Sequence, residues 1–228
     1  MAPVLPVHLP LSTRTGRVYT TPEMKMNSVF NGRRRESTHL AHFVGALLLT
    51  AACGADEDSS LPVCDQALCS VDDYDGDGDG VQTTVVRATD EDAPVYFSFA
   101  NPGAALSAQA IDAGDWDLSF ARTEIRVNGG ISGDGGVEIT WVDELSIDDA
   151  ETPSENTWVS DSDDDLAFSQ SKGWYRYDLL NHVVEPRDRL YYVRATDDSI
   201  YALEMISYYD YAGESRYPTF EWIALPNP

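Results

Sequence analysis

The sequence contains no apolar run long enough to cross a lipid bilayer. Its longest such segment, residues 42–52, is about half of the ~20 residues that a membrane-spanning helix requires. Arg33, Arg34 and Arg35 precede this segment, and a basic stretch followed by a short apolar one is typical of an export signal. The pattern therefore excludes a transmembrane helix at this position and indicates export.

Basic residues are also scarce, with 15 lysines and arginines against 39 aspartates and glutamates and a net charge of −24. After removal of residues 1–53 the counts are 9 basic and 37 acidic residues, a net charge of −28. A field of this sign repels nucleic acid phosphates and anionic lipid headgroups. We therefore exclude a nucleic acid partner. The same charge favours solubility and attracts divalent cations.

Motifs of hydrolytic and phosphate-binding enzymes are missing. The sequence has no Gly-x-Ser-x-Gly, no His-Glu-x-x-His and no phosphate-binding glycine loop. His182 is its one histidine after residue 53. Carboxylates are so frequent that no pair stands out as a glycosidase site. The sequence thus predicts a protein that is not an enzyme.

Cysteine occurs only three times, and the first of the three ends the export signal. Cys53 follows residues 47–52, Leu-Leu-Leu-Thr-Ala-Ala, which is how a bacterial lipoprotein signal ends. One departure is Thr50, which stands where such signals usually have leucine. We predict lipid attachment at Cys53 and a place in the cell envelope. An ordinary cleaved signal peptide, or a cytosolic protein with a chance match, is the alternative.

The other two cysteines, Cys64 and Cys69, are separated by four residues. An oxidising compartment permits a disulfide between them. Its short loop places the stabilisation at the low end of the roughly 2–4 kcal/mol that disulfides contribute. A metal site needs more ligands than two thiols, so the spacing favours a local disulfide.

Composition divides the chain into three parts. Residues 1–52 are an upstream extension and signal peptide, with Met24 or Met26 as an alternative start. Residues 53–82 are poor in apolar side chains and rich in Asp, Gly and Ser, which predicts an acidic surface tether. Residues 83–228 carry the strand patterns of one domain. Glycine after Cys53, rather than aspartate, is compatible with sorting to the outer membrane.

The tether contains carboxylates at every second residue, and glycines follow three of them. These are Asp73, Asp75, Asp77 and Asp79. Calcium prefers six to eight oxygen ligands from a flexible loop of this kind, and the pattern resembles the loops of thrombospondin type 3 and dockerin modules. Thr84 stands where an EF-hand has its closing glutamate. Weak calcium binding and a simple acidic spacer are the two interpretations.

From residue 83 onward, apolar and polar residues alternate in short runs separated by turn residues. The runs are residues 83–89, 95–99, 116–120, 137–142, 174–179, 190–196, 200–209 and 220–225. Helical periodicity is almost absent, and residues 104–113 are the one helix candidate. We predict an all-β domain of many short antiparallel strands with at most one or two short helices. The acidic residues 143–165 form either a solvated loop or a mobile flap.

Several short motifs then occur in a fixed order. Residues 116–122 read Trp-Asp-Leu-Ser-Phe-Ala-Arg, and residues 125–133 read Ile-Arg-Val-Asn-Gly-Gly-Ile-Ser-Gly. Gly-Trp-Tyr-Arg-Tyr follows at residues 173–177, and further matches lie at residues 182–186, 191–197 and 206–209. The ordered set resembles the HmuY-like family and covers about residues 83–225.

The resemblance implies an all-β, haem-binding lipoprotein of the outer membrane that hands haem to a TonB-dependent receptor. Members of this family hold haem iron between two axial histidine or methionine side chains, for which this chain offers His182 and Met205. A solvated loop position for His182 and a core position for Met205 are the alternatives, and a tyrosine phenolate is another source of a ligand. The competing function is a structural or protein-interaction lipoprotein that keeps the fold without haem.

Overall fold

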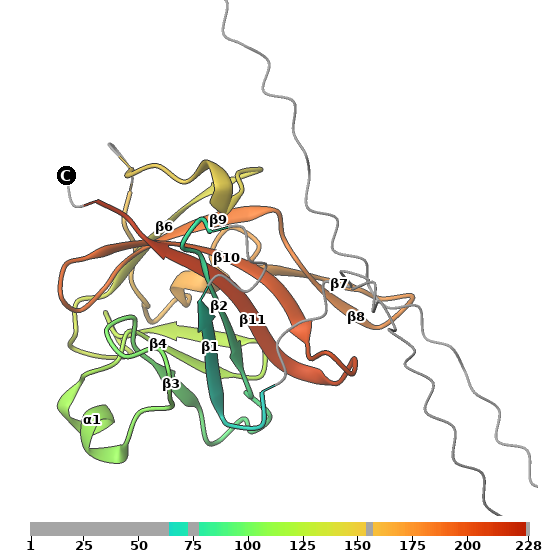
Figure 1. Cartoon of the computed structure of the whole chain (residues 1–228), viewed down its shortest axis with the longest axis horizontal. Coiled ribbons are helices and arrows are strands. Elements are labelled where there is room, and N and C mark those ends of the chain that lie inside the picture. Colours follow the sequence, from blue (N-terminus) through green and yellow to red (C-terminus); the bar gives the residue numbers. More distant parts are fainter. Residues whose placement is uncertain (1–63, 73–77, 154–156, 227–228) are drawn as a thin grey trace, which may run out of the picture. The chain divides into compact units, whose positions relative to one another are not determined.

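The structure is a computed structural model that describes residues 64–72, 78–153 and 157–226. The described residues belong to one compact unit, Ser60–Pro228, which carries the strands (Figure 1).

The principal element of this unit is a six-stranded antiparallel sheet (Figure 1). Its strands are, in spatial order, β1 (Leu68–Asp72), β2 (Gln82–Val86), β11 (Ser215–Ala224), β10 (Ile200–Tyr209), β9 (Arg189–Arg194) and β6 (Glu138–Asp143). The three strands 189–194, 200–209 and 215–224 are consecutive in the sequence and adjacent in the sheet. Their tight connections match the turn residues that the sequence places between them.

Two smaller antiparallel groups complete the strands. One is a three-stranded sheet of β3 (Val95–Phe97), β4 (Leu118–Ala121) and β5 (Glu124–Val127). The other is a two-stranded ribbon of β7 (Tyr175–Asp178) and β8 (Val183–Pro186). The helices are α1 (Ala108–Ala113) and two 3₁₀ turns, Ile147–Asp149 and Ala167–Ser169. The all-β prediction is confirmed, although the sequence pattern did not single out β1, β5 and β8.

The main core lies between the six-stranded sheet and the three-stranded sheet. The rings of Phe120 from β4 and Phe220 from β11 stack with centroids 5.5 Å apart. Phe97 of β3 meets the edge of Phe220 at 5.3 Å. Because side chains alternate along a strand, Leu203 and Met205 of β10 share this face and are buried with them.

The opposite face of the six-stranded sheet is also covered. Ala202 of β10 and Leu190 and Tyr192 of β9 form a second apolar cluster with Ile147 of the acidic segment. Burial on both faces explains why β9 and most of β10 are buried at consecutive positions rather than at alternate ones.

The acidic segment 143–165 is fastened to the domain in its described part. Val159 bridges Ile139 of β6, and Ser160 donates to the carbonyl of Val137 at 2.8 Å. The carboxylate of Asp161 is buried and accepts from the backbone N–H groups of Val127 and Ala167. The solvated-loop prediction fails for Asp161, whose carboxylate is a buried acceptor, whereas the other described acidic residues of the segment are exposed.

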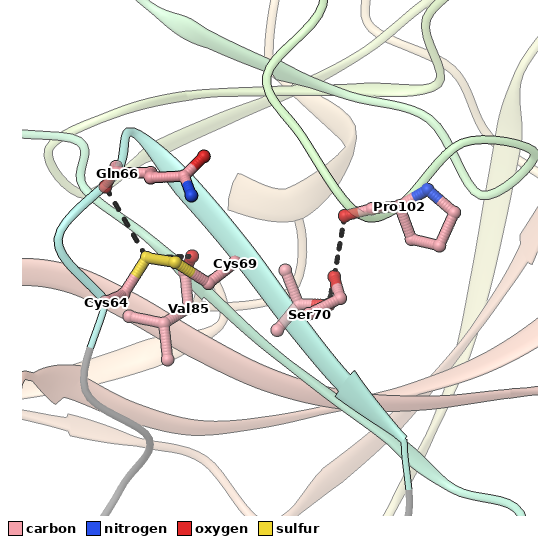
Figure 2. The surroundings of a disulfide bond; sticks show 7 residues. Cys64, Gln66, Cys69, Ser70, Val85 and Pro102 are labelled. Carbon is pink, nitrogen blue, oxygen red and sulfur yellow. Dashed lines mark hydrogen bonds between the residues drawn. A yellow bond between two sulfur atoms is a disulfide. The ribbon is translucent and has the colours of Figure 1, made fainter.

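The β sheet begins earlier than the expected boundary at residue 83. Strand β1 lies inside the segment predicted to be a tether, and its Leu68 is fully buried in the main core. A disulfide joins Cys64 to Cys69 at the start of this strand, and Figure 2 shows it against the backbone of Val85. Few apolar residues mark β1, so composition alone placed it in the tether.

Glu204 of β10 carries a carboxylate on the second face of the six-stranded sheet. It accepts from the backbone N–H of Ile147 at 2.8 Å and from the hydroxyl of Ser146 at 3.3 Å. Burial raises the pKa of Glu204 and outweighs these hydrogen bonds, which lower it. The folded state therefore disfavours the ionised form of Glu204. As a result, this group lowers the free energy of unfolding, and the loss grows as the pH rises from the unfolded-state pKa to the folded-state pKa.

Substitution of Glu204 by glutamine should raise the melting temperature at pH 7. The same substitution should give no increase at about pH 3, where the carboxyl group is protonated in both states. Thermal unfolding followed by circular dichroism at both pH values measures the difference. Glu214→Gln, at an exposed position, is the control for net charge. An equal increase in that control would contradict the burial explanation.

Candidate functional site

Two polar residues of the ordered motifs, Asp117 and Asn128, are buried hydrogen-bond centres. Asp117 accepts four hydrogen bonds, from the N–H of Phe99 and Thr196 and from the hydroxyls of Ser98 and Thr196. Asn128 donates to the carbonyls of Gly114 and Trp116 and accepts from the N–H of Gly135. These motif residues join loops to strands and leave no free polar atom for a ligand.

The motif glycines have a structural role as well. Gly130 has a φ of 64°, and a Cβ placed on it would lie 1.8 Å from the carbonyl oxygen of Asp161. A Cβ on Gly129 would lie 2.2 Å from the carbonyl oxygen of Val137. Only glycine fits these close backbone contacts. The candidate ligand site must therefore be sought elsewhere.

Met205 is not available as an iron ligand on the surface. Its side chain is 3% exposed and belongs to the main core, opposite Phe220 in the β10–β11 register. A thioether in this position fills space among aromatic rings, as methionine commonly does. Met205 lies in the core and His182 at the surface, so the arrangement does not support this pair of axial ligands, which stays a prediction.

His182 lies on the exposed loop that joins β7 to β8, and this ribbon projects from the sheets (Figure 1). Its backbone has a φ of 57°, which histidine adopts more readily than most residues. The imidazole Nδ1 lies 2.9 Å from the hydroxyl of Tyr177. This hydrogen bond fixes the ring and leaves Nε2 without a partner among the described residues.

Exposed apolar side chains are present on the same loop as this imidazole. Leu179 is 76% exposed and Leu180 is 91% exposed, while Tyr177 is about half-exposed. Exposed leucines next to a free imidazole nitrogen are a combination that suits an apolar ligand with a metal centre. The sequence predicted His182 as a candidate, but it contained no signal for the neighbouring leucines.

Asp178 stabilises the loop between β7 and β8 by hydrogen bonds. It accepts from the side-chain amide of Asn181 and from the backbone N–H groups of Leu180 and Asn181. The pKa of Asp178 is lowered, first by the amide of Asn181 and then by the two backbone donors. The loop is therefore ordered by an ionised carboxylate at neutral pH.

Two clefts lie on the surface of this unit, and the larger of them reaches the first residue of β7. The larger, about 430 Å³, is lined by Tyr175, Trp174, Phe168 and Lys172 among others. The smaller, about 300 Å³, lies against the three-stranded sheet and is lined by Tyr96, Trp116 and Arg126 among others. Glu124 borders both clefts. Strand β7 leads into the His182 loop. Of the two clefts, only the larger is lined by a residue of this strand.

The sequence profile of the HmuY protein family matches residues 90–222. The chain belongs to the HmuY family. No curated protein matches it in sequence.

Solved structures share the HmuY fold at low sequence identity. A candidate lipoprotein of Bacteroides fragilis is 20% identical with a TM-score of 0.52, over 73% of this chain and all of that one. The apo form of a HmuY analogue from Tannerella forsythia is 12% identical with a TM-score of 0.50, over 64% of this chain and 96% of that one. At these identities the likeness establishes the fold alone.

Most buried tyrosines of this HmuY-family chain are unsuitable as phenolate ligands. Burial raises the pKa of Tyr191 to about 12, although the guanidinium of Arg189 opposes the shift. Burial also raises the pKa of Tyr192, Tyr201 and Tyr208. These four phenols stay protonated at neutral pH.

The described residues do not extend to the whole predicted calcium loop. Asp73, Asp75 and Asp77 lie outside them, and Asp79 accepts from the backbone N–H of Val81. Within residues 64–72, 78–153 and 157–226 no three His, Cys, Asp or Glu side chains cluster as metal ligands. Calcium binding therefore stays a prediction.

Cys53 also lies outside the described ranges, and none of the helices found within them could cross a membrane.

Proposed function

We propose that the chain is a lipid-anchored protein of the cell envelope that binds haem and delivers it to a TonB-dependent receptor of the outer membrane. Membership of the HmuY family supports haem as the ligand, and the Bacteroides fragilis neighbour is itself a candidate lipoprotein. The signal pattern that ends at Cys53 supports the anchor.

The observation that carries the proposal is the exposed imidazole of His182 beside two exposed leucines. If Nε2 binds the iron, Nδ1 carries the proton and donates it to the oxygen of Tyr177. Such a partner orients the ring and makes it a better ligand. Leu179 and Leu180 would cover part of the porphyrin face and lose their contact with water.

His182 is the one axial ligand of the His or Met type that the chain offers at this surface. No other histidine follows residue 53, and Met205 is in the core. We therefore expect ferric haem with a single protein ligand and weaker retention than a site with two protein ligands would give.

Titration of the purified protein with ferric haem, followed by the Soret band, tests the proposal. His182→Ala should weaken binding at least about tenfold, since it removes the iron ligand. Met205→Leu conserves core volume and should leave the haem spectrum unchanged. Tyr177→Phe should bind haem with an affinity between those of His182→Ala and Met205→Leu.

A wild-type protein with no saturable spectral change at micromolar haem would contradict the haem proposal. The interaction lipoprotein would then be the better description of this family member. Equal binding by wild type and His182→Ala would contradict the assignment of the ligand.

A further inference from the structure

The larger cleft is built on rigid walls. The indole nitrogen of Trp174 donates to the carbonyl of Thr123 at 2.8 Å, which joins the β4–β5 turn to the start of β7. The rings of Trp174 and Tyr175 meet edge to face, with centroids 5.0 Å apart. Phe168 from the second 3₁₀ turn completes the aromatic floor. The cleft is thus preformed rather than dependent on a ligand.

A strained loop forms one rim of this cleft. Ser171, Lys172 and Gly173 have φ values of 50°, 78° and 75°. Two successive residues with side chains in this region are uncommon, and such strain persists only where surrounding contacts enforce it. The enforcing contact is Arg189, which is 3% exposed. It donates to the carbonyls of Ser171 and Gly173 at 3.1 and 3.3 Å.

Side chains of the six-stranded sheet hold Arg189 in place. Its Nε donates to the carboxylate of Asp143 at 2.6 Å, and its guanidinium lies over the ring of Trp141 at 5.3 Å. A buried arginine held in this way fixes both ends of the strained loop. Lys172 is therefore presented from a defined position at the cleft.

The ammonium group of Lys172 forms no hydrogen bond or ion pair with any side chain among the described residues. This is unexpected in a chain with 37 acidic and 9 basic residues after residue 53. Glu124, the other charged residue at the cleft, is paired with Arg126 at 2.7 Å. The cleft therefore offers one unpaired positive charge in a strongly negative protein, which favours an anionic group of a ligand.

The cleft borders the β7–β8 ribbon at Tyr175, the first residue of β7. Tyr175 and Tyr177 are two residues apart on β7, so they share a face and lie about 7 Å apart along it. Val184, which pairs with Tyr177, is buried in the core cluster, so this face turns toward the domain. The other face carries the exposed Arg176–Glu185 ion pair. Along the inner face, Lys172 precedes Tyr175 at one end and His182 contacts Tyr177 at the other.

We infer that Lys172 is the carboxylate anchor of the ligand site. Its ammonium pairs with a propionate of a porphyrin that lies against Tyr175 and Tyr177, with the iron toward His182. This inference rests on the proposed haem function. It adds a prediction about ligand selectivity, which is that the site selects a flat, apolar ligand that carries a free carboxylate. Arg189 is the positioning residue, because it acts through the backbone of the loop.

The test compares ferric haem with haem dimethyl ester, in which both propionates are neutral. The wild type should bind haem about tenfold more tightly than the diester, because a charge-assisted pair is lost with the ester. Lys172→Asn, which removes the charge and tolerates a positive φ, should bind both ligands with equal affinity. Lys172→Arg should restore the preference. Arg176→Gln, on the outer face of the ribbon, is the matched control and should behave as wild type.

The outcomes separate the two proposals. Failure of the wild type to bind haem would overturn the proposed function. Wild-type binding of haem and diester with equal affinity would overturn the carboxylate anchor and leave the function intact. A preference that survives in Lys172→Asn, or disappears in Arg176→Gln, would also overturn the assignment to Lys172. Unchanged thermal unfolding of Lys172→Asn shows that any loss of preference does not arise from misfolding.

Discussion

Replacing Asp117 with asparagine should lower the free energy of unfolding by about 3 kcal/mol. The carboxylate is 1% exposed and accepts hydrogen bonds at both oxygens, two at each. An amide keeps one oxygen but places an NH₂ group where two donors require an acceptor. The variant therefore retains the volume of the side chain and loses two buried hydrogen bonds.

Chemical denaturation monitored by tryptophan fluorescence measures this loss. Asp115→Asn, two residues earlier and exposed, carries the same change in charge and should alter stability by less than about 0.5 kcal/mol. Equal midpoints for Asp117→Asn and wild type would show that the hydrogen bonds of this carboxylate do not stabilise the fold.

A chain that begins at Thr83 should be less stable than one that begins at Ser60 by at least about 3 kcal/mol. The shorter chain lacks Leu68, which is fully buried, and exposes the edge of β2. It also uncovers Thr84, whose hydroxyl contacts Ser70 at 2.7 Å and accepts from the indole of Trp222 at 2.9 Å. This expectation differs from the sequence-based prediction of a surface tether at residues 53–82, because β1 pairs with β2 inside the sheet.

The measurement is the thermal transition of the two chains. The 60–228 chain with both Cys64 and Cys69 changed to serine separates the disulfide from the strand, because it keeps β1 without the cross-link. The melting temperature of this variant should lie between those of the other two chains. It should be nearer to that of the unmodified 60–228 chain, because a disulfide that closes a short loop contributes little stability. A Thr83 chain as stable as the 60–228 chain would show that β1 is peripheral.

Local pattern was sufficient for much of this fold. Short runs bounded by turn residues predicted the positions of β2, β9 and β10, because turn residues mark where one strand ends and the next begins. The helix candidate 104–113 contains α1, which begins after Ser107 and ends at Gly114 with a φ of 80°. Both ends carry residues with known capping geometry, so they are readable without tertiary contacts.

The role of the ordered motifs was not readable in the same way. The sequence showed that Asp117, Asn128 and Gly130 belong to a family pattern, but not whether they bind a ligand or hold the chain. Their partners, such as Thr196 for Asp117 and Asp161 for Gly130, are distant in sequence. Only the folded chain brings these groups together and assigns them a structural role.

Sequence patterns alone were enough to establish the all-β class, the strong negative charge, the family and the short set of axial ligand candidates. The tertiary structure decided which candidates are accessible, because burial depends on which face of a sheet another layer covers. It placed Met205 in the core and left His182 exposed on the ribbon. It also placed Lys172 at the cleft through the hydrogen bond from Arg189 to the carbonyl of Ser171, two residues 18 positions apart that no local pattern links.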